Sequence, residues 1–522
     1  MSSIEAQSPA DAPPAGGGGS IGRQMAQGTW WTVMSRLGVQ AIGFLSTLVL
    51  ARLLVPADFG LVALANTFSA ALLTISEFSL DVVLIQDRQA GREHYDTAWT
   101  LCVLRNLGLA LALALAADKI GVFFEDPRVA LIIYWLAAAT FLDGFCNVGI
   151  VDFRRDLAFK KDMIYTVLGK FGTFLIGVSL AYFWRNYWAL VGGAVAGAVI
   201  RVLLSYVMHP FRPRFTLVRW RELMSFSKWL ILNNFCAFLF TRSDTFVIGK
   251  IIGPQAVGLY GMAFDIANMT TSNLLAPMRR ALFPAYATVS REPARLSAAF
   301  VDVFAFVMLI GTPLALGIGL VAGPLIHVML GPQWLDTIPL IQVLSLYGLL
   351  NLVSAGSGPI FLATGRPQYM MYVQGSTTFI MIPLLILGTL HYGAVGAATA
   401  VTITTAIAVL IDFQLVIRLL HLPVRVLLRA SWRPMLAGAG MTPAVLAPQL
   451  FWPEPQSLAG WGGLLALGVL TGALLYPALV LLLWCLAGRP EAAERHVLAW
   501  LGERLHIRRA RSAAWAARQP SA

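Results

Sequence analysis

The chain has 522 residues, of which 58% are hydrophobic and only 12% are charged, and its formal net charge is +12. Soluble domains are about a quarter charged, so this composition excludes an ordinary cytosolic enzyme. The apolar residues form runs of about 20, which is the length that spans the roughly 30 Å hydrocarbon core of a bilayer as a helix. The sequence therefore predicts an all-α polytopic membrane protein.

Apolar windows separated by charged or proline-bearing breaks predict about fourteen transmembrane helices. The residues before the first window are rich in Gly and Pro and contain no hydrophobic run, so 1–27 are predicted to be a disordered cytoplasmic tail. The predicted helices cover residues 28–52, 59–84, 97–117, 128–150, 163–183, 187–208, 228–250, 256–278, 298–321, 338–362, 369–390, 393–417, 433–451 and 460–486.

Grouped along the chain, these spans predict five further parts. They are a first six-helix lobe at 28–208, a basic cytoplasmic linker at 209–227, a second six-helix lobe at 228–417, two additional transmembrane helices at 418–486 and a basic cytoplasmic tail at 487–522.

The distribution of Lys and Arg gives the predicted orientation. With the N-terminus inside, 28 of the 38 basic residues fall on inner segments and only 5 on outer ones. Cytoplasmic loops carry an excess of Lys and Arg. Both termini are therefore predicted to be cytoplasmic, and the positive balance reflects membrane topology rather than nucleic-acid binding.

Two stretches of the chain are similar to each other. Residues 52–61, Arg-Leu-Leu-Val-Pro-Ala-Asp-Phe-Gly-Leu, align without a gap on residues 250–259, Lys-Ile-Ile-Gly-Pro-Gln-Ala-Val-Gly-Leu. Each follows an odd-numbered span, and six spans separate them, so the two halves are predicted to be parallel repeats. Pro and Gly would fix a tight outer turn in each copy.

The first of these stretches also carries a family resemblance. Residues 51–65 resemble the signature of polysaccharide-transporter-type, Wzx-like oligosaccharide flippases of the multidrug/oligosaccharidyl-lipid/polysaccharide exporter superfamily. Further matching segments are Trp188-Ala189-Leu190-Val191, Ile248-Gly249-Lys250, Gly258-Leu259-Tyr260, Leu282-Phe283-Pro284-Ala285, Leu330-Gly331-Pro332-Gln333-Trp334 and Gly365-Arg366-Pro367.

The resemblance implies two six-helix lobes around a central cavity, with the last two helices outside this core. It implies outward flipping of a polyprenyl-pyrophosphate-linked oligosaccharide across the bacterial inner membrane, for exopolysaccharide, capsule or lipopolysaccharide synthesis. Membrane lipids, a polysaccharide polymerase and a chain-length regulator are the other partners that it implies. No cofactor is expected.

Cations inside the predicted spans are candidates for substrate binding, because a charge at the membrane centre costs at least roughly 2.5–3.5 kcal/mol. At 1.5 Å per residue, four of them share one level about 10–12 Å below the inner surface. Guanidinium groups bind phosphates in bidentate fashion, which suits a pyrophosphate. The four are Arg36, Arg105, Lys170 and Arg201, and Arg242 is the one mid-span cation of the second repeat.

Acidic residues inside the spans are candidates for charge pairing or ion coupling. Paired carboxylates would lower the cost of leaving the cations without a ligand. Snorkelling of each cation toward the headgroups is the alternative explanation, and the membrane potential is the alternative driving force. The five acids are Glu77, Asp143, Asp244, Asp265 and Asp302.

Other functional classes are disfavoured. No nucleophile elbow, P-loop or His-Glu-x-x-His motif is present, and no large outer loop is predicted, so no catalytic residue is assigned. The four cysteines show none of the close pairing of a zinc site, so no metal is assigned. A cation-coupled multidrug exporter of the same superfamily is the first alternative, but it would need a cavity with acidic rather than basic binding groups.

Residues 87–92 partly match a loop motif of major-facilitator transporters, so a porter of that class is a second alternative.

Overall fold

The computed structural model describes residues 18–76, 84–85, 91–220, 242–451, 455–490 and 494–495. All regular secondary structure within these ranges is helical, which confirms the predicted all-α class. The predicted acid Glu77 and most of the predicted cytoplasmic tails lie outside them. Helix α1 begins at Gly18, so residues 18–27, which were predicted to be disordered, are helical.

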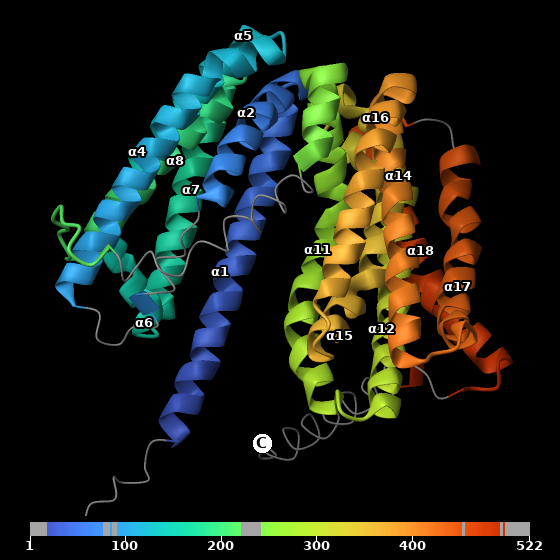
Figure 1. Cartoon of the computed structure of the whole chain (residues 1–522). Coiled ribbons are helices and arrows are strands. Elements are labelled where there is room, and N and C mark those ends of the chain that lie inside the picture. Colours follow the sequence, from blue (N-terminus) through green and yellow to red (C-terminus); the bar gives the residue numbers. More distant parts are fainter. Residues whose placement is uncertain are drawn as a thin grey trace, which may run out of the picture. The chain divides into compact units, whose positions relative to one another are not determined.

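The chain divides into two compact units (Figure 1). Unit 1 comprises Met1–Leu54 and Ala65–Leu239, and unit 2 comprises Val55–Leu64 and Phe240–Ala522. The first repeat therefore contributes a ten-residue stretch to unit 2, and this stretch contains the start of α2.

Unit 1 is a helical bundle in which α4 packs on α5, α5 on α8, α8 on α7 and α7 on α1. Small residues bring α7 and α8 together, since a β-carbon added at Gly193 would lie 3.2 Å from the Cα of Gly177. The helices are α1 (Gly18–Leu53), α2 (Pro56–Ile75), α4 (Arg92–Phe123), α5 (Pro127–Asp143), η1 (Val148–Val151), α6 (Asp152–Arg155), α7 (Phe159–Trp184) and α8 (Trp188–Met208).

The fourth predicted span is shorter than expected. It ends at Asp143 rather than at 150, and the following η1–α6 segment is bent by 71° from α5. Asn147 fixes this bend, because its side-chain oxygen caps η1 through the Gly149 amide at 2.9 Å and its amide nitrogen donates to the Phe211 carbonyl at 2.7 Å. Asp143, predicted to lie within a span, is therefore the last residue of its helix.

The first half of the predicted linker is an ordered strap, residues 209–219, which runs along the first turns of α4. Its main chain donates to α4 side chains: Arg214 N to Asp96 Oδ1 at 2.8 Å, and Thr216 N to Thr100 Oγ1 at 3.0 Å. Phe215 packs against Trp99 with 4.8 Å between ring centroids. These bonds satisfy backbone amides that have no helical partner.

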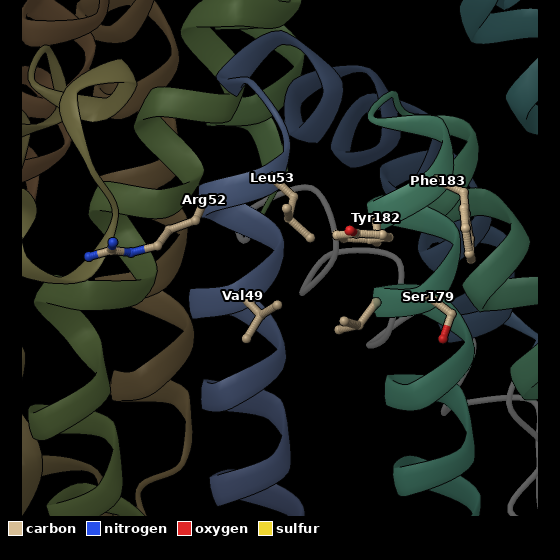
Figure 2. A pocket seen from close by; sticks show the side chains of 7 residues that line it. Val49, Arg52, Leu53, Ser179, Tyr182 and Phe183 are labelled. Carbon is tan, nitrogen blue, oxygen red and sulfur yellow. The ribbon is translucent and has the colours of Figure 1, made fainter.

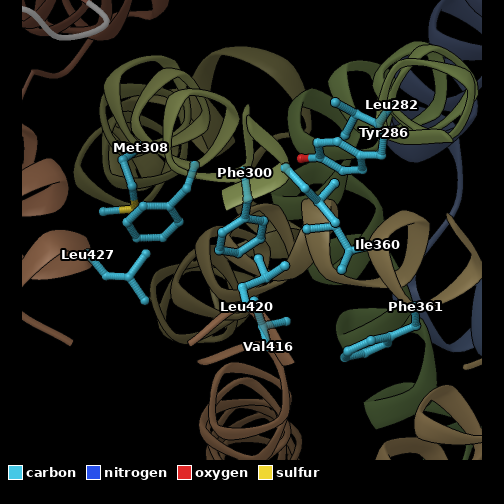
Figure 3. Close-up of a cluster of buried hydrophobic side chains, with 11 residues drawn as sticks. Leu282, Tyr286, Phe300, Met308, Ile360, Phe361, Val416, Leu420 and Leu427 are labelled. Atoms are coloured by element: carbon cyan, nitrogen blue, oxygen red, sulfur yellow. The ribbon is translucent and has the colours of Figure 1, made fainter. Parts of the chain in front are cut away.

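Unit 2 is built around a cluster of large apolar side chains drawn from five helices (Figure 3). Tyr286 of α11, Phe300 of α12 and Phe361 of α15 are each only 1% exposed. The helices are α11 (Pro254–Val289), α12 (Pro293–Leu320), α13 (Ala322–Met329), η2 (Pro332–Trp334), α14 (Thr337–Val353), η3 (Ser354–Gly356), α15 (Ser357–Ala363), α16 (Gln368–Leu420), α17 (Val424–Phe451) and α18 (Leu458–Leu486).

Helix α16 contains two of the predicted spans. Its backbone breaks at Gly393, where φ is 63° and ψ is −146°, a conformation that glycine adopts without strain. Nine helices among the described residues are long and apolar enough to cross a membrane, or ten if the bent pair around α5 counts as one. The total of fourteen stays a prediction.

The two similar stretches pack against each other within unit 2. A β-carbon at Gly60 would lie 1.6 Å from the Pro254 carbonyl oxygen, and one at Gly258 would lie 1.9 Å from the Pro56 carbonyl oxygen. The contact is reciprocal, because Pro56 aligns with Pro254 and Gly60 with Gly258. We call this contact the glycine crossing. It requires two residues without side chains, which explains why both copies carry glycine at this position.

Candidate functional site

A polar cavity of about 380 Å³ lies inside unit 1, between α4, α5, α7 and α8. Its charged lining residues are Arg105, Asp143 and Arg201, all three of which were predicted as site residues. Thr140, Asn106 and Tyr165 add hydroxyl and amide groups to the lining. The described lining residues thus carry a net charge of +1, from side chains on three different helices.

Arg201 of α8 and Asp143 of α5 form a forked ion pair. Arg201 Nη2 lies 2.8 Å from Asp143 Oδ1 and 2.6 Å from Oδ2, and Nε lies 3.1 Å from Oδ1. The side chains are 43% and 34% exposed, so the pair lies at the cavity wall rather than in a sealed core. The stem of Arg201 packs on Gly169 of α7, and the Tyr165 hydroxyl donates to the Arg201 carbonyl at 3.4 Å.

Arg105 of α4 is the second cation of the cavity, and its guanidinium group has few hydrogen-bond acceptors among the described residues. Its Nη2 makes one long hydrogen bond, 3.4 Å, to the Asn106 side-chain oxygen. Its Nε is buried and has no hydrogen-bond acceptor in the part of the chain that the structure describes. Within the described ranges no carboxylate lies within ion-pair distance of Arg105. A buried guanidinium nitrogen without an acceptor is costly unless a ligand supplies one.

The other predicted cations do not line this cavity. Arg36 of α1 and Lys170 of α7 have exposed side chains, and the Lys170 stem lies near Gly43 of α1. Arg242 is also exposed, at the start of the helical residues 242–251 of unit 2. Of the predicted four-cation cluster in the first repeat, the cavity therefore holds two.

The predicted acids of unit 2 have different surroundings. Asp244 accepts hydrogen bonds from the Thr245 amide at 2.6 Å and from the Tyr260 hydroxyl at 3.1 Å. Asp265 of α11 and Asp302 of α12 have exposed side chains. Asp244 is thus the one of these three that is held by a set of neutral donors.

A buried ion pair that sequence reasoning missed joins α17 to the C-terminal region. Arg433 Nε lies 3.1 Å from Glu494 Oε1, and the two side chains are 4% and 5% exposed. Arg433 is the first residue of the predicted span 433–451, and Glu494 falls in the predicted cytoplasmic tail. Removing either partner would leave a buried charge, so this pair fixes Glu494 to α17.

A larger cavity of about 510 Å³ lies between the C-terminal ends of α1 and α7 (Figure 2). Val49, Leu53 and Tyr182 give it an apolar lining. Arg52 also borders this cavity, but Figure 2 shows its guanidinium group on the side of α1 away from Tyr182. This cavity suits hydrocarbon, whereas the smaller one has the chemistry to hold an anion.

Comparisons with known proteins give consistent matches. Residues 49–339 match the family described as polysaccharide biosynthesis protein. The lipopolysaccharide biosynthesis protein WzxC of Escherichia coli K12 is 24% identical over 76% of this chain and 82% of that protein. The succinoglycan biosynthesis transport protein ExoT of Rhizobium meliloti is 25% identical over 60% of this chain and 64% of that protein.

The fold is that of a solved transporter. The lipid II flippase MurJ, in an inward closed conformation, superposes with a TM-score of 0.65, over 88% of this chain and 99% of MurJ, at 13% identity. This likeness confirms the polytopic helical fold.

Proposed function

Because this chain belongs to the polysaccharide biosynthesis protein family, we propose that it flips a polyprenyl-pyrophosphate-linked oligosaccharide from the cytoplasmic to the outer leaflet of the bacterial inner membrane. The observation that carries this proposal is the polar cavity of unit 1. There, Arg105 Nε lacks an acceptor among the described residues, and Arg201 is already held in a forked geometry. Two guanidinium groups facing one cavity match the two phosphates of a pyrophosphate.

The positive net charge of the described lining residues argues against an exporter of cationic drugs. Exporters of cationic compounds need acidic binding groups, whereas the charged groups among the described lining residues are one carboxylate and two guanidinium groups. The names of the relatives, which refer to lipopolysaccharide and succinoglycan, support a glycan as cargo. The cargo moves without bond making, so the protein is a transporter and not an enzyme. A polysaccharide polymerase and a chain-length regulator would act on the flipped product.

Transport should respond to membrane potential. A headgroup with about two negative charges that moves outward from an inside-negative compartment gains roughly 4.6 kcal/mol per 100 mV, which is about a 2,000-fold bias. We expect purified protein in vesicles to flip a lipid-linked oligosaccharide faster when a potassium-diffusion potential is imposed without a proton or sodium gradient. Vesicles without protein are the control.

Two outcomes of this experiment count against the proposal in different ways. No flipping under any gradient would reject the flippase function. Flipping that ignores the potential and follows a pH step would reject potential-driven transport and favour coupling through carboxylates such as Asp244.

The orientation has its own test. We expect cysteine at Asp156 or Arg212, both exposed and on predicted inner loops, to be protected from an impermeant maleimide in intact cells. Cysteine at Gln255, exposed on the predicted outer hairpin, should be labelled. The four native cysteines are replaced by alanine in all variants, and permeabilised cells give the full labelling level. Labelling at 212 in intact cells would contradict cytoplasmic termini.

A further inference from the structure

Asp143 occupies the position that an anionic ligand needs. Its two oxygens accept hydrogen bonds from Arg201 at 2.6–3.1 Å, which is the arrangement that a phosphate would form with the same guanidinium group. Because both oxygens are used, a ligand cannot make the same forked contact while Asp143 stays in place. The cavity therefore contains a side chain, Asp143, that competes with an anionic ligand for Arg201.

The two arginines differ in their need for a ligand. Arg105 is open to a first phosphate, since its Nε has no acceptor. Arg201 becomes available to a second phosphate only when Asp143 leaves. The pair is more than a third exposed on each side, so its net contribution is modest and exchange with another anion is feasible.

The displaced carboxylate would then face a multiply charged ligand. Among the described residues, the titratable and charged groups around it are Arg105 and Cys102 of α4, Cys146 after α5, Tyr165 of α7 and Arg201 of α8. Both cations among them would be engaged by phosphate oxygens. A carboxylate next to a like charge favours its protonated form.

From this geometry we infer that Asp143 is a displaceable internal counter-anion, which yields Arg201 to a diphosphate ligand and takes up a proton as it does so. This inference rests on the proposed function, because it assumes that the ligand is a pyrophosphate. When the ligand leaves, Asp143 pairs with Arg201 again and its proton is released. One proton thus travels with each ligand and offsets one of its two negative charges, so the potential still favours outward transport, with half of the gain expected for two charges.

The test is calorimetric titration of the purified full chain with inorganic pyrophosphate, in buffers of different ionisation enthalpy. These buffers report the number of protons taken up on binding. We expect Asp143→Asn to bind pyrophosphate about three- to tenfold more tightly than the wild type, because the competitor is gone. We also expect it to take up about one proton fewer. Pyrophosphate's own protonation is common to both proteins and cancels in this difference.

Asp126→Asn is the matched control. Asp126 lies at the other end of α5 and also holds an arginine, with Oδ2 2.7 Å from Arg128 Nη2. Because it lies outside the cavity, its replacement should change neither affinity nor proton uptake. Asp143→Glu should retain the proton uptake of the wild type. Asp143→Ser replaces the Asn variant if the latter is not recovered folded.

The outcomes separate the inference from the function on which it rests. If the wild type binds pyrophosphate, but removal of the carboxylate neither tightens binding nor changes proton uptake, Asp143 is a structural partner and the inference is wrong. Weaker binding by the neutral variants would also overturn it. No pyrophosphate binding by the wild type would reject the cavity as the substrate site.

Discussion

Replacing Gly60 by alanine should remove folded protein from the membrane. The new β-carbon would lie 1.6 Å from the Pro254 carbonyl oxygen, and a main-chain atom at a helix start cannot turn aside as a flexible side chain would. We expect a destabilisation above about 4 kcal/mol, which is at the exceptional end for single substitutions. The measurement is the membrane level of a tagged protein together with its thermal unfolding in detergent.

Gly261→Ala is the control for this substitution. Gly261 lies one turn after Gly258 on α11, and an added β-carbon would meet nothing within 4 Å, so this variant should accumulate like the wild type. Gly258→Ala should fail as Gly60→Ala does, because the crossing is reciprocal. Normal levels and unfolding temperature for Gly60→Ala would show that the two helices do not meet this closely.

Arg105→Ala and Arg201→Ala should abolish most glycan export while leaving the protein level intact. Each variant removes charge-assisted hydrogen bonds to the pyrophosphate worth about 1.5–3 kcal/mol, which corresponds to a loss of roughly tenfold to a hundredfold. Lysine should restore export only in part, because an ammonium group does not form the forked contact. The measurement is surface polysaccharide in a deletion strain that carries each variant.

Arg128→Ala provides the comparison for charge removal outside the cavity. Arg128 is exposed and pairs with Asp126 outside the cavity, so export should remain near the wild-type level. The hypothesis that all four cations bind substrate is tested by Arg36→Ala and Lys170→Ala. Because these two side chains are exposed, we expect smaller losses of export than for the variants at Arg105 and Arg201. Normal export by both cavity variants would refute the cavity as the substrate site and leave snorkelling as the role of these arginines.

Part of this architecture could be predicted from the sequence. Apolar runs fix which segments are helical, because their period and length depend on the chain alone. The gapless alignment of residues 52–61 on 250–259 identified the stretches that form the glycine crossing. Depth along a helix also follows from residue counting, which brought Arg105 and Arg201 to the same predicted level.

The direction of a side chain around its helix could not be predicted in the same way. Arg105 and Lys170 share a predicted depth, but one faces the cavity of unit 1 and the other is exposed on α7. The bend after Asp143 also depends on a long-range partner, since Asn147 bonds to Phe211, 64 residues away. A pattern of local hydrophobicity contains no information about such partners.

The residues of the strap and the α4 residues that hold it should differ in how freely they vary among relatives. Its own contribution to the hydrogen bonds comes from main-chain amides, which every residue except proline supplies. At positions 214 and 216 the side chain is therefore free to change among relatives, provided that it is not proline, whereas Phe215 and Arg219 also contact α4 through their side chains. Asp96 and Thr100 contribute side-chain oxygens, so descendants of this sequence should retain an acceptor at both positions. Variation should thus concentrate at positions 214 and 216 of the strap, and invariance at the two α4 positions that accept their hydrogen bonds.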